Sequence, residues 1–203
     1  MESRFLALFH LLIWVAVLAA CSESFTDPRD GQSYDVVKIG TAAWFAENLN
    51  FETPGSVCPE GDKRNCSTYG RLYTWDEARV ACPAGWRLPD SSDFAALVEQ
   101  AGGSATAGDA LKSTGGWFKK GNGSDAFGFG ALPAGYRLGG SEDAAGKFDG
   151  IGGYAYFWSA TATPDDLAYY LFLDFSSKSA GMNAFPKGDA RSVRCVQAGA
   201  AID

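Results

Sequence analysis

The chain has 203 residues, of which 25 are glycine and 14% are aromatic, and its hydrophobic content is 46%. These values predict a single globular domain that buries a real core, behind a targeting segment. The formal net charge of −7 argues against a nucleic-acid partner, because phosphate binding needs a basic face.

Residues 1–20 are expected to be a signal peptide. Arg4 and the free amino group form a weakly basic start, and the run 5–18 is apolar apart from His10. That run is too short to span a bilayer comfortably but has the length of a signal-peptide core. His10 is the only histidine in the sequence, so a cleaved chain would contain none. Ser-His-Asp catalysis, Cys-His catalysis and most zinc sites are then excluded.

The signal segment ends in Leu18-Ala19-Ala20-Cys21, which is similar to the bacterial lipobox. We therefore expect Cys21 to be lipidated and to hold the protein on the outer membrane, on either its periplasmic or its surface face. The alternative is ordinary cleavage that leaves Cys21 as a free thiol. The expected boundaries are a tether over 21–30, a domain over 31–198 and a tail over 199–203.

Four further cysteines follow, at Cys58, Cys66, Cys82 and Cys195. Export to an oxidising compartment predicts two disulfides, for which three pairings are possible. A local bridge between Cys58 and Cys66 suits the turn-rich segment between them, and it leaves Cys82 to pair with Cys195. A metal site is the competing interpretation, but no pair has C-x-x-C spacing.

Two helices are expected in the first half of the chain. Residues 34–39 are β-prone, and Thr74 can then cap a helix that runs through Ala81. Asp90 is a candidate N-cap for a second helix, which carries apolar residues at helical spacing until Gly102-Gly103.

The second half of the chain is expected to hold loops and strands. Residues 102–125 and 137–153 are rich in Gly, Ser and Asp and predict long loops. Strands are predicted over 154–160, 168–175 and 192–197.

Six motifs in register carry a family resemblance. They are Trp44 with Glu47-Asn48-Leu49; Tyr69-Gly70-Arg71-Leu72-Tyr73-Thr74-Trp75; Cys82-Pro83-Ala84-Gly85-Trp86-Arg87-Leu88-Pro89; Ala131-Leu132-Pro133-Ala134-Gly135-Tyr136-Arg137; Phe157-Trp158-Ser159; and Ser192-Val193-Arg194-Cys195-Val196. This series resembles the Fibrobacter succinogenes major paralogous domain family over about residues 30–197.

The resemblance implies an exported lipoprotein and no established reaction. The R-L-P segment with its helix, and the W-S segment, are also similar to the C-type-lectin-like fold, which formylglycine-generating enzymes share. The expected fold is therefore α+β, C-type-lectin-like, with two helices, short antiparallel strands and long Gly-rich loops. Function does not follow from such a fold.

The resemblance raises two candidate sites that the residues do not favour. A lectin-type calcium site would need Glu-Pro-Asn or Gln-Pro-Asp with Trp-Asn-Asp, and Trp158-Ser159-Ala160 stands in the place of the last. The carboxylates available for such a site, without fixed spacing, are Asp143, Asp149, Asp165, Asp166 and Asp174. An enzyme of the formylglycine-generating type would need Cys82 or Cys195 free. We therefore expect no metal, no cofactor and no catalytic residue.

Aromatic residues in loops are the remaining ligand candidates, because an aromatic ring suits the apolar face of a sugar. Trp117 and Phe118 lie in a Gly/Lys/Asn-rich loop, with Tyr136 and Tyr154 as weaker candidates. The alternative for Trp117 is that it covers a small satellite core. The other loop and strand tryptophans considered, Trp44, Trp75, Trp86 and Trp158, are expected in the core.

The leading hypothesis is a lipid-anchored surface module that binds plant cell-wall polysaccharide or a neighbouring envelope protein. One alternative is a structural envelope lipoprotein without a small ligand. The other is an enzyme related to formylglycine-generating enzymes.

Overall fold

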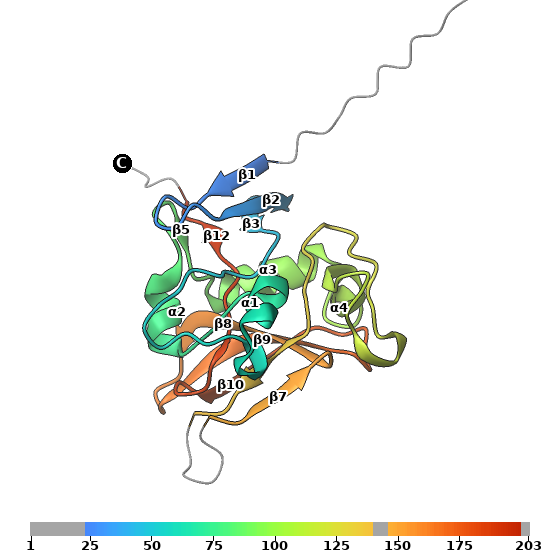
Figure 1. Ribbon diagram of the computed structural model, residues 1–203. Coiled ribbons are helices and arrows are strands. Elements are labelled where there is room, and N and C mark those ends of the chain that lie inside the picture. The colour runs from blue at the N-terminus through green and yellow to red at the C-terminus, as the bar shows by residue number, and fades with distance from the viewer. Residues whose placement is uncertain (1–22, 140–145, 200–203) are drawn as a thin grey trace, which may run out of the picture.

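The computed structural model describes residues 23–139 and 146–199, and these form a mixed α+β fold with largely antiparallel sheets (Figure 1). The expected signal peptide, the lipidation site Cys21 and residues 200–203 of the expected tail lie outside the described residues. Two five-stranded sheets enclose the core, and a separate two-stranded ribbon lies beside them.

The first sheet joins the beginning and the end of the described chain. Its strand order is β1-β2-β3-β12-β5. The strands are β1 (Glu23–Thr26), β2 (Ser33–Ile39), β3 (Ala42–Phe45), β12 (Val196–Gln197) and β5 (Trp86–Arg87). Burial alternates along β2, where Tyr34 and Val36 are buried and Asp35 is exposed, as expected for a strand with one face on the core. The ring of Tyr34 stacks on that of Phe45, with centroids 4.5 Å apart.

The tether predicted for residues 21–30 is wrong over its described part. Strand β1 pairs with β2 from Glu23 to Thr26. The ring of Phe25 lies 5.7 Å from that of Phe45, and Asp27 is fully buried and bonded to Arg29. The segment is polar enough to resemble a linker, but four paired residues and the partly buried Phe25 attach it to the sheet.

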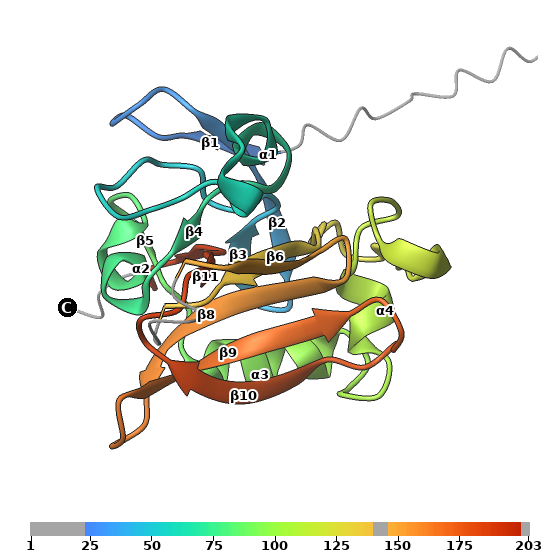
Figure 2. The same ribbon diagram turned by 60° about the horizontal axis from the view of Figure 1, so that its bottom comes forward.

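The second sheet is built mainly from the C-terminal half of the chain, with β4 added from the first half (Figure 2). Its order is β10-β9-β8-β11-β4, with β11 and β8 parallel and the other neighbours antiparallel. The strands are β10 (Gly181–Pro186), β9 (Leu167–Asp174), β8 (Tyr154–Ala162), β11 (Arg191–Ser192) and β4 (Leu72–Tyr73). The ribbon consists of β6 (Ala134–Arg137) and β7 (Phe148–Ile151). Strands β7 and β10 were not anticipated by the sequence pattern, and β7 lies inside a predicted loop.

Both expected helices are present, and two short helices accompany them. The α-helices are α1 (Lys63–Tyr69), α2 (Trp75–Ala81), α3 (Ser91–Gln100) and α4 (Ala107–Leu111), with single 3-10 turns η1 (Pro59–Gly61) and η2 (Phe118–Lys120). Helix α4 lies inside the predicted loop 102–125 and buries Ala107 and Leu111. Its Gly108 packs so closely on the Ser179 backbone that a Cβ has no room there. Close packing therefore requires a glycine at this position. Because glycine has a low helix propensity, the sequence pattern did not predict the helix.

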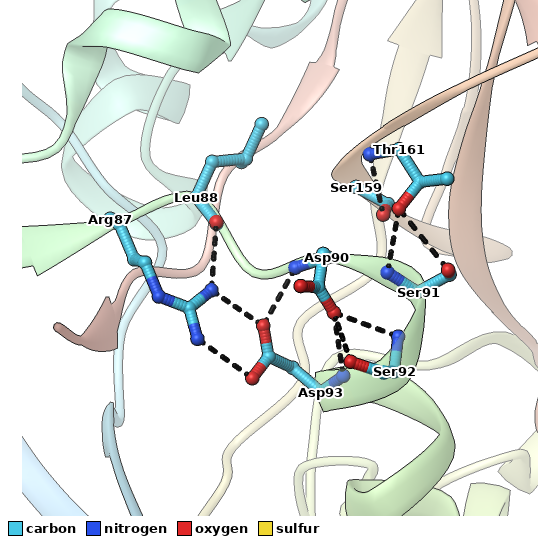
Figure 3. A network of polar contacts seen from close by, with 8 residues as sticks. All are labelled: Arg87, Leu88, Asp90, Ser91, Ser92, Asp93, Ser159 and Thr161. Atoms are coloured by element: carbon cyan, nitrogen blue, oxygen red, sulfur yellow. Dashed lines mark hydrogen bonds and ion pairs between the residues drawn. The ribbon is translucent and has the colours of Figure 1, made fainter. Parts of the chain in front are cut away.

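Helix α3 starts in a dense polar network (Figure 3). The Asp90 side chain accepts from the backbone N–H of Asp93 at 3.0 Å, and the Asp93 side chain accepts from the backbone N–H of Asp90 at 2.7 Å, which completes a capping box. Arg87 donates to both carboxylate oxygens of Asp93, at 2.6 and 2.9 Å. The backbone N–H of Ser91 donates to Thr161 of β8 at 3.0 Å. This network ties α3 to both sheets.

Both expected cysteine pairs are at disulfide distance, Cys58 with Cys66 and Cys82 with Cys195. The first closes a sequence separation of 8 residues and the second a separation of 113. The second therefore ties the end of α2 to the segment that leads into β12.

Removal of the long-range bridge should destabilise the fold more than removal of the local one. The chain-entropy model assigns about 4.8 kcal/mol to the Cys82–Cys195 bridge and about 2.5 kcal/mol to the Cys58–Cys66 bridge. We expect the Cys82→Ala/Cys195→Ala variant to lose roughly 2 kcal/mol more than Cys58→Ala/Cys66→Ala in urea unfolding. Equal losses would contradict this ranking.

The Asp90 cap should be sensitive to acid. Its hydrogen bond from Ser92 lowers the pKa of Asp90 against the opposing effect of burial. Because the folded-state pKa lies below the unfolded one, the stabilisation is complete above about pH 4 and is lost as the pH falls through the lower folded-state value. We expect Asp90→Ala to cost about 0.5–2 kcal/mol at neutral pH and less below about pH 3. Urea unfolding of both proteins across this pH range provides the measurement, and a pH-independent difference would sink the explanation.

Candidate functional site

The side chains of β8 and β9 alternate between two faces of the second sheet. One face of the sheet packs against α3 and contributes apolar side chains to the core. Helix α3 lies behind β9 and β10 in Figure 2. The other face carries Tyr154, Tyr156 and Trp158 on β8, opposite Asp174, Phe172 and Tyr170 on β9. Near Trp158 this face is buried, whereas Tyr154, Tyr156 and Phe172 are only partly buried.

The partly buried end of this face forms a hollow of about 350 Å³ that we call the tyrosine hollow. It is lined by Tyr154, Tyr156, Tyr170, Phe172, Asp174, Ser176 and Asn183. Tyr154 and Tyr156 lie nearly parallel, with ring centroids 5.6 Å apart and planes 25° apart. Tyr170 meets Tyr156 edge to face at 5.1 Å. The hollow therefore combines aromatic rings with a carboxylate, a hydroxyl and an amide at its rim.

Glycines provide the space in which these rings lie. A Cβ at Gly150 would stand 2.7 Å from the ring of Tyr154, and one at Gly181 would stand 2.7 Å from the ring of Phe172. Gly150 also has a φ of +80°, which disfavours any other residue there. Both rings thus rest directly on backbone, which limits the positions open to them.

The buried side chain of Arg191 packs against the sheet face that carries these rings, which we call the aromatic face. Arg191 is 1% exposed and its guanidinium lies within cation–π distance of five rings. The distances to the ring centroids are 4.2 Å for Tyr170, 4.9 Å for Trp158, 5.0 Å for Phe185, 5.1 Å for Tyr156 and 5.5 Å for Tyr136. Its charge is paired with Asp189 at 2.9 Å. One cation therefore contacts two of the rings that line the hollow, Tyr156 and Tyr170, together with three rings beside it.

The hydroxyls of Tyr156 and Tyr170 stay protonated at neutral pH. Burial raises the pKa of both Tyr156 and Tyr170, against the smaller opposing effect of the Arg191 charge on Tyr170. A protonated phenol can donate as well as accept a hydrogen bond. At the rim, Asp174 accepts from the hydroxyl of Ser176 at 2.6 Å, and Asn183 is exposed.

The structure separates the aromatic residues that the sequence proposed. Trp117 is 6% exposed, belongs to the main core, and donates from its indole N–H to Ser113 and Ala131. Its prediction as a ligand residue is therefore corrected in favour of the packing alternative. Phe118 is exposed, Tyr154 lines the tyrosine hollow, and Tyr136 packs beside it with its ring 5.4 Å from Tyr156.

Sequence reasoning missed Tyr156, Tyr170, Phe172 and Asn183. The alternation Tyr154, Tyr156, Trp158 in the predicted strand already placed three aromatic residues on one face. Only the register with β9 shows that Tyr156 stands opposite Phe172. Asn183 belongs to β10, a strand that the sequence pattern did not indicate.

A second hollow, of about 440 Å³, lies between the β2–β3 turn and α3. Trp44 is its only aromatic lining residue, and it is 1% exposed. This hollow therefore offers a ligand no aromatic face.

Across the described ranges, no three His, Cys, Asp or Glu side chains cluster as a metal ion would require. Asp143, one of the carboxylates considered for calcium, lies outside those ranges. In the same part of the chain, no helix has the length and apolar character needed to cross a membrane.

Comparison with known families confirms the resemblance drawn from the motifs. The model of the Fibrobacter succinogenes major domain matches residues 37–197. The chain belongs to this family. No curated protein and no solved structure matches the chain. The family places the chain among related domains but assigns no ligand to the tyrosine hollow.

Substitution of Arg191 should destabilise this domain strongly. Arg191→Met leaves the Asp189 carboxylate buried without its cation, which typically costs about 3–5 kcal/mol. We expect Asp189→Asn/Arg191→Met to recover part of that loss, because no charge is then left unpaired. Urea unfolding of the two variants and the parent gives the comparison; a loss below about 1 kcal/mol for Arg191→Met would contradict a dominant role for the buried charge.

Proposed function

We propose that this domain is a non-catalytic carbohydrate-binding module and that the tyrosine hollow receives a sugar ring. The observation that carries the proposal is the hollow itself, in which partly exposed aromatic rings stand beside Asp174 and Asn183. The apolar face of a pyranose can pack on such rings, while its hydroxyls pair with carboxylate and amide groups. Rings seated on glycine backbone are already placed for that contact, which reduces the entropy lost on binding.

Charge favours a neutral glycan over an acidic one. Asp174 is the charged side chain that lines the tyrosine hollow, and the chain as a whole carries a formal charge of −7. The carboxylates of a uronic-acid polymer would be repelled by these negative charges, whereas a neutral glucan, xylan or mannan carries no charge to be repelled. Neutral plant cell-wall polysaccharides are the class that we propose.

The proposed location suits such a role. We propose lipidation at Cys21 and attachment to the outer membrane, from the similarity of residues 18–21 to a lipobox. Strand β1 begins two residues after Cys21, and it lies at the opposite end of the fold from β10 in both views (Figures 1 and 2). A lipid at Cys21 would therefore leave the β10 side of the domain remote from the bilayer.

The proposal of a binding role rather than an enzymatic one is supported by the cysteines. Cys82 and Cys195 are joined to each other, so neither offers the thiolate that a formylglycine-generating type of reaction would use. Relation to the C-type-lectin-like fold remains a prediction from the motifs.

Binding should depend on the rings and the amide of the tyrosine hollow. We expect Tyr154→Leu, which keeps an apolar side chain but removes the flat ring, to weaken retention on a neutral polysaccharide at least about tenfold, or about 1.4 kcal/mol. Asn183→Ala should weaken it in the same direction. Affinity electrophoresis of the full chain through gels containing glucan, xylan, mannan or polygalacturonate measures both, with circular dichroism to confirm folding.

Phe127→Ala is the matched control, because Phe127 is 38% exposed but lines no hollow of the aromatic face. It should be retained like the parent. Absence of retention of the parent on every neutral polysaccharide would remove the carbohydrate proposal, and retention on polygalacturonate alone would reverse the argument from charge. Crosslinking to an envelope protein without glycan retention would favour the protein-partner alternative.

A further inference from the structure

A third hollow, which we call the phenylalanine hollow, adjoins the tyrosine hollow and shares one lining residue with it. This phenylalanine hollow encloses about 430 Å³. Its lining residues include Glu60, Phe118, Asp149, Tyr154 and Phe175. Tyr154 lines both hollows, and its ring contacts Tyr156 on one side at 5.6 Å and Phe175 on the other at 6.3 Å. The two hollows therefore adjoin each other at the Tyr154 ring.

Phe118 stands at the outer end of this surface. It is 55% exposed, and its ring meets that of Phe175 edge to face at 6.5 Å. Its backbone N–H donates to the carbonyl of Gly152 at 2.8 Å, and its ring lies so close to Gly152 that a Cβ there would overlap it. Phe118 is thus fixed against the β7–β8 turn, with more than half of its side chain open to a ligand.

The backbone that follows Phe118 is strained. Lys119 and Lys120 have φ values of +49° and +64°, in the left-handed region that non-glycine residues seldom adopt. Gly121 then packs directly on the backbone of Phe175. Strain of this kind persists only where the surrounding structure enforces it. Here it accompanies a large apolar side chain held in solvent, a position that core packing does not explain.

The charged side chains that line the phenylalanine hollow have the same sign as the one that lines the tyrosine hollow. The charged side chains that line the two hollows are Glu60, Asp149 and Asp174, all of them acids. The ammonium of Lys119 lies 5.4 Å from the centre of the Phe175 ring, at the edge of this surface. A neutral glycan is therefore favoured over an acidic one along the whole length of the surface.

We propose that the two hollows are successive subsites for one linear, neutral polysaccharide chain that passes over Tyr154. One sugar lies in the tyrosine hollow, and a sugar further along the same chain stacks on Phe118. This inference rests on the proposed function and extends it from a single sugar ring to a polymer. Contacts at the second subsite add to affinity because the first subsite already holds the chain nearby.

Calorimetric titration of the full chain tests the second subsite. The probes are oligosaccharides of the neutral polysaccharide that retains the parent protein best, from the monosaccharide to the hexasaccharide. We expect affinity to rise with length until the chain covers both hollows and then to level off. Phe118→Ala should bind the shortest oligosaccharide like the parent and the longest about tenfold more weakly. Phe127→Ala should match the parent at every length.

The outcomes separate the inference from the function on which it rests. If affinity does not change with length, or if Phe118→Ala matches the parent at every length while Tyr154→Leu still loses binding, the second subsite is refuted and the single-sugar proposal stands. If no oligosaccharide binds, the proposed function itself fails. Loss of short and long oligosaccharides alike in Phe118→Ala would show one undivided site and would also overturn the inference.

Discussion

The complete burial of Arg194 is the constraint on which the arrangement of this domain depends. Its guanidinium donates to the carbonyls of Phe45, Ala46 and Phe129 and to the side-chain oxygen of Asn48. Burial lowers its pKa to about 9, so it still carries a charge at neutral pH. Its Nε is buried without a hydrogen-bond partner among the described residues, so these four acceptors must offset the cost of burying the charge. Arg194 is therefore accommodated only when the C-terminal end of β3, the segment that follows it and the loop that precedes β6 have all folded around it.

The same short segment extends this constraint to the candidate site. Arg191, three residues earlier, enters the second sheet through β11 and lies beneath the tyrosines, whereas Cys195 closes the long-range disulfide. Residues 191–197 thus cross from one sheet to the other, and each sheet receives a buried group from them. Geometry at the aromatic face is in this way coupled to the integrity of the core. Changes near β12 that destabilise the fold would therefore also alter the positions of the rings.

Three rings at the aromatic surface are positioned by contact with backbone. The rings of Tyr154, Phe172 and Phe118 lie on Gly150, Gly181 and Gly152, respectively. Glycine at these positions lets a ring approach the backbone closely, and the ring then loses little further freedom when a ligand covers it. This explains why the partly exposed rings can be ordered without being buried. It also accounts for one role of the many glycines in the composition.

The sequence by itself determined the local features and the family. The bounds of α2, the Asp90 cap of α3, the strand at β2 and the cysteine pairing depend on neighbours a few residues apart or on counting, although the Thr74 side chain makes no cap hydrogen bond to α2. Six motifs in order indicated the family that the comparison established. Tertiary structure alone decided which aromatic residues face solvent. Trp117 and Phe118 are adjacent, yet one is in the core and the other is exposed. Burial of such neighbours is set by long-range packing, and the pairing of Tyr156 with Phe172 by strand register, neither of which a local pattern encodes.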